Sequence, residues 1–325
     1  MLTVYTPDLK KLKKEEAPGA LPANPVWVDL LDPTKEEEDL VERALQVDVP
    51  TREEMKEIEI SSRLYKEGEA LFMTATLLSN TASELPEALP VTFVLANRSL
   101  ITIRYSGPKS FQIFSTRAQR IGGDYTSKEI VLVGLLESVV DRLADVLENI
   151  ANEVDAVSQE IFKYQKDGPS GNPRDFRDIL RRIGQKGDLN SKARESLIGL
   201  GRLLTFLGHS LDSSRTISRD LKGRIKTLSQ DTHALTDHVS FLSNKINFLL
   251  DATLGMISIE QNTIIKIFSI AAVVLLPPTL VASVYGMNFN FMPELKWFLG
   301  YPFALVLMVL AAVIPYWYFK RRGWL

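Results

Sequence analysis

The amino-acid sequence predicts an α/β domain at the N-terminus, then long α-helices, and finally two transmembrane helices at the C-terminus. Three observations predict this order. Short β-rich runs alternate with polar turns up to about residue 105, apolar residues recur at helical spacing from residue 126 onward, and two uncharged apolar segments lie near the C-terminus. We therefore expect a cytosolic α/β domain (1–125), a cytosolic long-helix region (126–263) and a transmembrane region (264–325).

The first region contains four runs with the composition of β-strands, at residues 26–30, 70–78, 91–96 and 99–105. Asp32-Pro33, followed by Glu36 to Glu38, predicts a helix start after the first run. These elements predict a small α/β layer. We expect carboxylates such as Glu36 to Glu38, and also Asp141 and Asp145, to lie on solvated helix faces.

The second region opens with Thr126-Ser127-Lys128-Glu129, which has the pattern of a capping box. An apolar stripe follows, and the segment 168–173, rich in glycine and proline, interrupts it before a second helix. From about Ile217 the apolar spacing continues without a proline as far as Leu276, which predicts one helix of about 90 Å. Such a long helix would join the cytosolic regions to the membrane.

Two segments carry no charged side chain, namely the 27 residues 267–293 and the 23 residues 297–319. About 20 apolar helical residues cross a hydrocarbon core of roughly 30 Å. Lys320, Arg321 and Arg322 place the C-terminus in the cytoplasm by the positive-inside rule, and two spans return the N-terminus to the same side. The expected segments are a first span at about 264–286, an external loop at about 287–296, a second span at about 297–319 and a cytosolic tail at 320–325.

One face of the first span is mostly small or polar. Starting before the span, its residues follow alternating steps of four and three: Asp251, Gly255, Ser258, Asn262, Ile265, Ser269, Ala272, Leu276, Thr279 and Ser283. The stripe indicates either close helix packing or the wall of a water-filled lumen. Because two spans cannot enclose a pore, a lumen requires several copies around an axis. Pro277 and Pro278 should kink or loosen this helix.

The composition excludes several kinds of site. Without cysteine the chain has no disulfide, iron–sulfur cluster or thiol catalysis. His209, His233 and His238 do not share one helix face, so we expect no histidine metal site, and Gly199-Leu200-Gly201 falls in a helical pattern rather than after a strand. We find no catalytic constellation and expect no enzyme.

The charge is unevenly distributed along the chain. Residues 1–263 hold 33 basic and 39 acidic residues, a net charge of −6, whereas the last 62 hold five and one, a net charge of +4. An acidic body argues against nucleic acid as a partner and favours cations.

Two motifs frame the segment between the spans. Tyr285-Gly286-Met287-Asn288 closes the first span, and Met292-Pro293-Glu294-Leu295 precedes the second, which ends in Lys-Arg-Arg-Gly-Trp-Leu. This combination resembles the CorA family of magnesium and cobalt channels. Ile259-Glu260-Gln261-Asn262 and Leu276-Pro277-Pro278-Thr279-Leu280 are similar to its enterobacterial-type branch. The close resemblance covers residues 240–325.

The resemblance implies a homopentameric, funnel-shaped channel whose first span lines the pore. By position, the residues that meet the metal ion are Gly286, Met287 and Asn288 in an outer selectivity ring, with Asn262, Thr279 and Asp251 further along. The other pore-lining positions are Ile265, Ser269, Ala272, Leu276 and Ser283. Asn290 stands where many relatives carry an acidic residue, so an external ring of charge would rest on Glu294 alone. An alternative for Asn262 is an amide that sets the register of a helical bundle.

The resemblance also implies Mg²⁺ influx across the inner membrane, with Co²⁺ and Ni²⁺ as less favoured ions, and closure by internal Mg²⁺ bound between subunits. Mg²⁺ prefers six oxygen ligands and sheds water reluctantly, so neutral amide oxygens suit a hydrated ion. Two alternatives remain open: a zinc transporter of the same superfamily, and a membrane-anchored sensor or scaffold that moves no ion.

Overall fold

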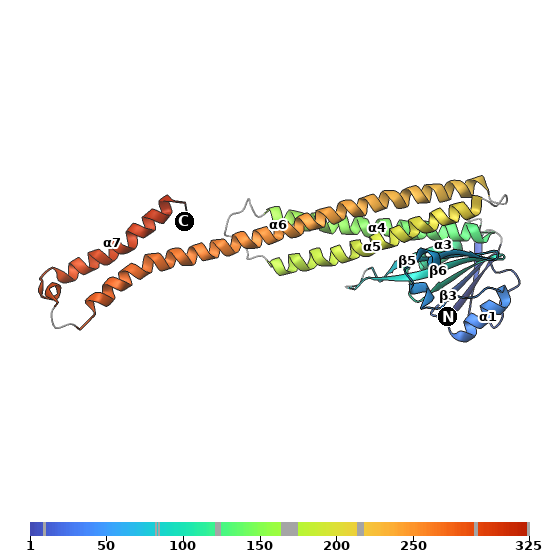
Figure 1. Cartoon of the computed structure of the whole chain (residues 1–325), viewed down its shortest axis with the longest axis horizontal. Helices are drawn as coiled ribbons and strands as arrows, with labels where there is room; N and C mark the ends of the chain where they lie inside the picture. Colours follow the sequence, from blue (N-terminus) through green and yellow to red (C-terminus); the bar gives the residue numbers. More distant parts are fainter. Residues whose placement is uncertain are drawn as a thin grey trace. The chain divides into compact units, whose positions relative to one another are not determined.

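The computed structural model describes residues 1–8, 11–81, 83, 85–120, 125–163, 175–212, 218–288 and 292–323. The chain divides into two compact units, Met1–Leu250 (unit 1) and Asp251–Leu325 (unit 2). One long helix, α6 (Arg219–Tyr285), contributes residues to both units (Figure 1).

Unit 1 is built on a seven-stranded sheet in the order β2-β1-β3-β7-β6-β5-β4. Neighbouring strands are antiparallel except for β3 and β7, which are parallel. The strands are β1 (Leu2–Asp8), β2 (Lys11–Glu16), β3 (Trp27–Leu31), β4 (Leu64–Glu67), β5 (Ala70–Ser79), β6 (Glu87–Ala96) and β7 (Ser99–Arg104). The four predicted runs correspond to β3, β5, β6 and β7. The sequence did not predict β1, β2 or β4.

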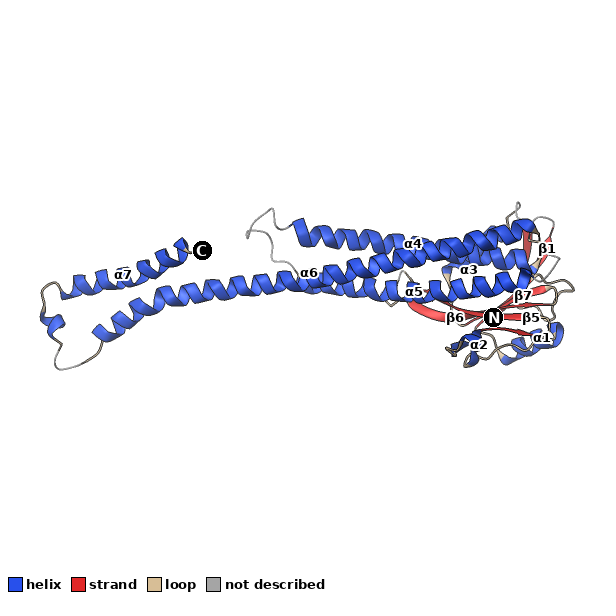
Figure 2. Cartoon of the chain, turned by 45° about the horizontal axis from the view of Figure 1, so that its top comes forward, coloured by secondary structure: helices blue, strands red, loops and turns tan. Residues whose placement is uncertain are grey.

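Helices cover both faces of this sheet (Figure 2). On one face lie α3 (Lys109–Ala118), α4 (Lys128–Lys163) and α5 (Phe176–Asp212), and on the other lie α1 (Lys35–Leu45), α2 (Ile60–Arg63) and the short 3₁₀ helix η1 (Glu54–Lys56). Gly199 lies inside α5, as its pattern predicted, and a Cβ at this position would lie 3.7 Å from the Thr76 backbone nitrogen. Because 3.7 Å is an ordinary van der Waals distance, α5 packs against β5 here without requiring a glycine.

The core of unit 1 lies on both sides of the sheet. Toward α1, a buried cluster includes Val41 and Leu45 of α1 with Val28, Leu30 and Ile103 of the strands. Toward α3, Trp27 stacks on Tyr5 with ring centroids 4.1 Å apart and meets Phe114 edge-on at 5.5 Å.

A buried ion pair crosses the parallel strands β3 and β7. Arg104 Nε and Nη2 donate to the two Asp29 carboxylate oxygens at 3.0 and 2.7 Å, and both side chains are at most 10% exposed. Thr102 donates a further hydrogen bond of 2.7 Å to Asp29. Because the charges are paired and hydrogen-bonded, burial is tolerated here, whereas removal of one partner would leave an uncompensated charge.

The expectation that Glu36 to Glu38 form only a solvated face is wrong for Glu37. Thr34 and Glu37 form a capping box at the start of α1. Glu37 also accepts the N-terminal amine of Met1 at 2.7 Å and the backbone N–H of Leu2 at 2.8 Å. Burial raises the pKa of Glu37, but these hydrogen bonds outweigh it and hold the pKa below its ordinary value.

Helices α4, α5 and the first part of α6 pack together in unit 1. The Asn190 side-chain amide of α5 donates to Val239 O at 3.2 Å and to Ser243 Oγ at 2.8 Å, and Lys245 of α6 pairs with Asp155 of α4. α4 begins at Lys128, where Ser127 Oγ accepts the Ile130 N–H. The predicted break at 168–173 lies outside the described residues.

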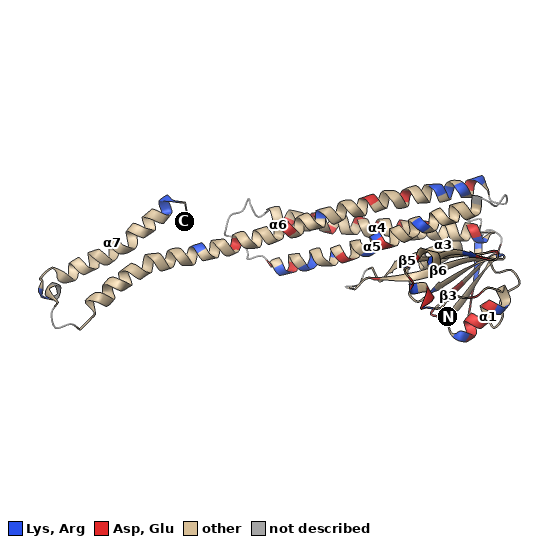
Figure 3. Ribbon diagram, in the orientation of Figure 1, with Lys and Arg blue, Asp and Glu red and all other residues tan. Residues whose placement is uncertain are grey.

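Unit 2 contains the last part of α6, the 3₁₀ helix η4 (Pro293–Lys296) and α7 (Gly300–Arg321). By length and composition alone, α6 and α7 each contain a segment apolar enough to cross a membrane, and only 6% of each segment is buried within the chain. Lys and Arg, Asp and Glu are sparse along these parts and frequent on the helices of unit 1 (Figure 3).

Candidate functional site

The predicted pore-lining residues all lie on α6. The helix runs without interruption through Asn262, Ile265, Ser269, Ala272, Leu276, Thr279 and Ser283, so their spacing of three and four places them along one side. All seven are exposed in the single chain, including Ile265 at 61% and Leu276 at 65%. Of residues 262–283, only Ile270 is buried. Side-chain exposure in a single chain therefore does not distinguish the predicted pore-lining residues from those on the other faces of the span.

The two prolines do not end α6, which continues to Tyr285. Figure 1 shows that the last part of the helix bends. Pro277 and Pro278 lack the N–H groups that would donate to Val273 and Val274, so the helix continues there with two fewer backbone hydrogen bonds. The next residue, Thr279, donates from Oγ1 to Leu275 O at 2.8 Å. The Thr279 hydroxyl proton is thus used within the helix, and its oxygen faces other groups as an acceptor.

The Gly286-Met287-Asn288 motif forms the end of this helix. The Gly286 N–H donates to Ala282 O at 2.9 Å, and the Met287 N–H donates to Val284 O at 3.3 Å. Gly286 lies at the turn that follows the helix, and it is not among the residues with positive φ. A Cβ at this position would lie 3.2 Å from Ala282 O, which is a tight contact with the preceding turn. Asn288, two residues past the turn, is exposed.

The segment after the motif is described only in part. The backbone of Glu294 lies in η4, whereas its side chain and the whole of Asn290 lie outside the described residues. The predicted external ring of charge is therefore not placed by the structure.

Asp251 is the first residue of unit 2 and is exposed on α6. By helical spacing it precedes Asn262 on the same stripe. Among the described residues, no group of three or more histidine, cysteine, aspartate or glutamate side chains is placed to hold a metal ion. Within one chain, the oxygen-bearing side chains of the stripe thus lie one above another rather than around a common centre.

A separate polar contact in unit 1 was missed from the sequence. Arg224, near the start of α6, donates from Nε and Nη2 to the two Glu137 carboxylate oxygens of α4 at 2.8 and 2.7 Å. Burial raises the pKa of Asp141, one turn further along α4. No spacing rule predicted the Glu137–Arg224 pair, because its partners are 87 positions apart.

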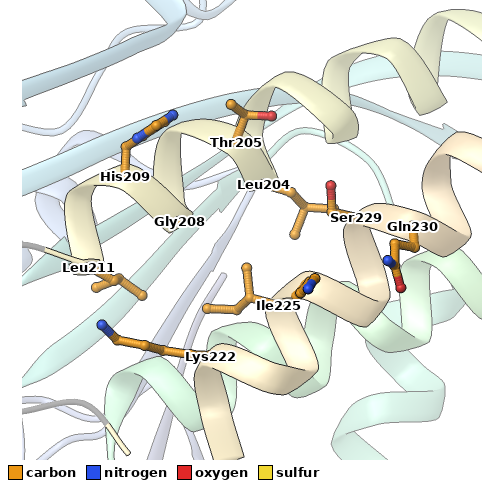
Figure 4. A pocket seen from close by; sticks show the side chains of 10 residues that line it. Leu204, Thr205, Gly208, His209, Leu211, Lys222, Ile225, Ser229 and Gln230 are labelled. Carbon is orange, nitrogen blue, oxygen red and sulfur yellow. The ribbon is translucent and has the colours of Figure 1, made fainter. Parts of the chain in front are cut away.

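A cavity of about 500 Å³ lies between the end of α5 and the start of α6 (Figure 4). Leu204 and Leu211 of α5 and Ile225 of α6 supply apolar surface. Its charged lining residues are the lysines Lys222 and Lys226 rather than carboxylates, so the cavity is unsuited to a divalent cation.

Comparison with known proteins agrees with these features. Residues 22–321 match the family described as CorA-like Mg²⁺ transporter protein. The chain is 35% identical over 333 aligned positions to the magnesium transport protein CorA of Escherichia coli K12, covering 100% of both chains, and 36% identical over 324 positions to that of Salmonella typhimurium, covering 98% and 96%. The CorA magnesium transporter from Methanocaldococcus jannaschii has the same fold, with a TM-score of 0.77, 19% identity and coverage of 100% and 99%. The chain therefore belongs to the CorA-like Mg²⁺ transporter family.

Proposed function

We propose that this chain is one subunit of a channel that carries Mg²⁺ into the cell across the inner membrane. Membership of the family and full-length relatives named magnesium transport proteins support this proposal. In it, residues 1–125 and 126–263 are cytosolic, residues 264–325 form the membrane region, and both termini lie in the cytoplasm. Co²⁺ and Ni²⁺ are further candidate ions.

The conducting unit in this proposal is a homopentamer. Two helices of one chain cannot surround an aqueous path, so the α6 stripes of several copies must face a common axis. The near-complete exposure of the apolar segments, each only 6% buried, supports this, because they need partners other than their own chain. Lipid would cover the outer faces and other copies the inner ones.

The observation that carries the proposal is the position of Asn288, which is exposed directly after α6 in the Gly286-Met287-Asn288 motif. A ring of five amide oxygens accepts hydrogen bonds from the water molecules around Mg²⁺. The ion then enters hydrated, without the cost of stripping its water. Neutral ligands also hold the ion weakly enough to release it.

Further rings follow along α6. Asn262 and Thr279 offer side-chain oxygens, and the Thr279 oxygen acts as an acceptor because its proton is donated to Leu275 O. Asp251 would place carboxylates where the lumen meets the cytosol. Ile265 and Leu276 would form apolar constrictions that close by dewetting.

Gating by internal Mg²⁺ completes the proposal. Residues 1–263 carry 39 acidic and 33 basic residues, so neighbouring subunits repel one another unless cations lie between them. Bound Mg²⁺ would reduce this repulsion and hold the pore closed. The gating part of the proposal is abandoned if removal of internal Mg²⁺ leaves both the ion flux and the protease sensitivity of unit 1 unchanged.

The decisive experiment measures uptake of Mg²⁺, Co²⁺, Ni²⁺ and Zn²⁺ by liposomes that contain the purified full chain, under an imposed voltage. A potential of 100 mV contributes about 4.6 kcal/mol for a doubly charged ion. We expect Mg²⁺ uptake to rise with the voltage. Preferential Zn²⁺ uptake would support a zinc transporter, and liposomes that stay tight to all four ions would support a sensor or scaffold.

A further inference from the structure

The part of α6 in unit 1 has two opposite faces of different character. One face packs inside unit 1 through Thr232, Val239, Leu242, Ile246 and Leu249, all buried. The other face is exposed at each step, through Asp237, Phe241, Asn244 and Phe248. At about 100° per residue, these two sets lie on opposite sides of the helix.

The exposed face carries two large aromatic side chains. Phe241 and Phe248 are each 59% exposed, although Phe241 stacks on His238 and Phe248 on Phe162, with ring centroids 6.2 and 6.1 Å apart. Leaving two phenylalanines in water one heptad apart is unfavourable, because each retains much unburied apolar surface. The arrangement indicates that other molecules cover this face.

The spacing of these residues indicates that further copies of the same chain cover this face. Counting back from Asp251 in steps of three and four reaches Phe248, Asn244, Phe241 and Asp237 in turn. This is the same alternation that links Asp251 to Asn262 and the other stripe residues of the span. Residues 237–251 span two heptads, over which this spacing drifts by only about 40° on one uninterrupted helix, so Asp251 and the two phenylalanines lie on one side of α6. In the proposed function, Asp251 faces the axis of the assembly.

We propose that Phe241 and Phe248 form two apolar collars around the axis of the assembly, on the cytosolic side of Asp251. This inference rests on the proposed function. Each collar lies between rings of oxygen-bearing side chains, because Asp237, Asn244 and Asp251 alternate with the two phenylalanines. The oxygen rings accept hydrogen bonds from hydrated Mg²⁺, whereas a closed aromatic collar offers none to the ion's water. The collars thus act as a second barrier to the ion, separate from Ile265 and Leu276.

The chain contains no cysteine, so single-cysteine variants of the full protein test the geometry directly. We expect Phe248→Cys and Phe241→Cys to form covalent links between copies on mild oxidation or with a short thiol cross-linker. The matched control is Asn247→Cys, which is exposed on the same turn but about 100° away around the helix. It should cross-link at least fivefold less than Phe248→Cys.

Flux measurements test the barrier itself. With Mg²⁺ inside the liposomes to close the channel, Phe248→Ala and Phe241→Ala should each raise residual Mg²⁺ influx at least threefold. Phe248→Leu should stay within twofold of the wild type, because it keeps a large apolar side chain. Phe162→Ala, which removes only the ring partner within the chain, should do the same.

Failure of this inference differs from failure of the proposed function. Two outcomes would contradict the collars while leaving the proposed channel intact, provided that the wild type carries Mg²⁺. One is that Asn247→Cys cross-links as well as Phe248→Cys, and the other is that the alanine variants leak no more Mg²⁺ than the wild type. If the wild type carries no Mg²⁺, both the collars and the channel are wrong.

Discussion

Unit 1 buries its apolar side chains within its own fold, whereas unit 2 leaves many of its apolar side chains exposed. In unit 1, Phe93, Val28 and Ile101 are completely buried by the chain's own sheet and helices. In unit 2, Leu275, Leu280 and Phe268 of α6 are 65%, 66% and 72% exposed. The same kind of residue therefore stabilises unit 1 from within, whereas in unit 2 its apolar surface is left uncovered by the chain itself.

Helix α6 belongs to both units and shows both patterns of burial. Before residue 250 it has a buried face and an exposed face, and after residue 251 most of its side chains are exposed. Substitutions at buried positions should therefore act on folding of unit 1, whereas substitutions along the stripe should act on transport.

Phe93→Ala should lower the free energy of unfolding of unit 1 by about 3–5 kcal/mol, since it leaves a cavity at a residue that is 0% exposed. Urea unfolding of the detergent-solubilised chain, followed by near-ultraviolet circular dichroism, measures this. The control Leu280→Ala, in unit 2, should change the same transition by less than about 0.5 kcal/mol. Equal effects would contradict the independence of unit 1.

Asn288→Ala should reduce Mg²⁺ influx at least tenfold, since it removes the amide oxygen proposed to hold the hydrated ion, while unit 1 and the assembled state stay unchanged. Liposome uptake and size-exclusion chromatography measure the two properties. Gln261→Ala removes an amide one residue off the stripe and should stay within twofold of the wild type. Near-normal uptake by Asn288→Ala would falsify the assignment of the outer ring.

Glu37→Ala should destabilise unit 1 by about 1–2 kcal/mol, because the α1 capping box and the bonds to Met1 and Leu2 are lost together. The same urea transition measures the loss. Glu38→Ala breaks a pair with Lys35, whose side chain is 69% exposed, and should have an effect below about 0.5 kcal/mol. A larger effect of Glu38→Ala would show that the cap is not the cause.

Tyr5→Phe should change how the stability of unit 1 depends on alkaline pH. Burial raises the pKa of Tyr5 to about 12 from 10.0, so the folded state retains a proton that the unfolded state releases between these values. Wild-type stability therefore falls as the pH rises from 10 toward 12, and the variant lacks this contribution. At neutral pH the variant should lose only about 1 kcal/mol, for the hydrogen bond to Ser115. Parallel pH profiles of the two urea midpoints would contradict this.

Asp251→Ala should change the Mg²⁺ conductance less than threefold, because an exposed ring of carboxylates attracts the ion without forming the outer filter. The change should shrink at high ionic strength, as expected for a screened charge. Asp145→Ala, an exposed carboxylate on α4, serves as the control and should leave conductance unchanged. A tenfold loss for Asp251→Ala would instead indicate a tight binding site.

The sequence predicted the central strands better than the edges. Strands β3, β5, β6 and β7 are rich in apolar and β-branched residues, which is the composition that buried strands require. The charged strand Lys11–Glu16 and the four-residue strand Leu64–Glu67 are the two edges of the sheet. Their strand conformation depends on pairing with a neighbour, which local composition does not reveal.

For the candidate site, the sequence was informative because its features are local. The stripe follows from spacing within one helix, and Gly286-Met287-Asn288 is a contiguous motif. By contrast, Glu37, which binds the N-terminus, and the Glu137–Arg224 pair join residues far apart in the chain. Asp141 and Glu137 lie one turn apart on α4, yet Asp141 is exposed, as expected, whereas Glu137 is partly buried by its contact with Arg224 of α6.

The sequence by itself determined the family, the two apolar segments and the order of the candidate pore residues, because periodicity, absence of charge and short motifs are properties of neighbouring positions. Only the tertiary structure decided which side of α6 packs against α4 and α5 and which side leaves Phe241 and Phe248 exposed. The reason is physical: helical spacing defines the faces of a helix, but the surfaces against which it packs decide which face is buried.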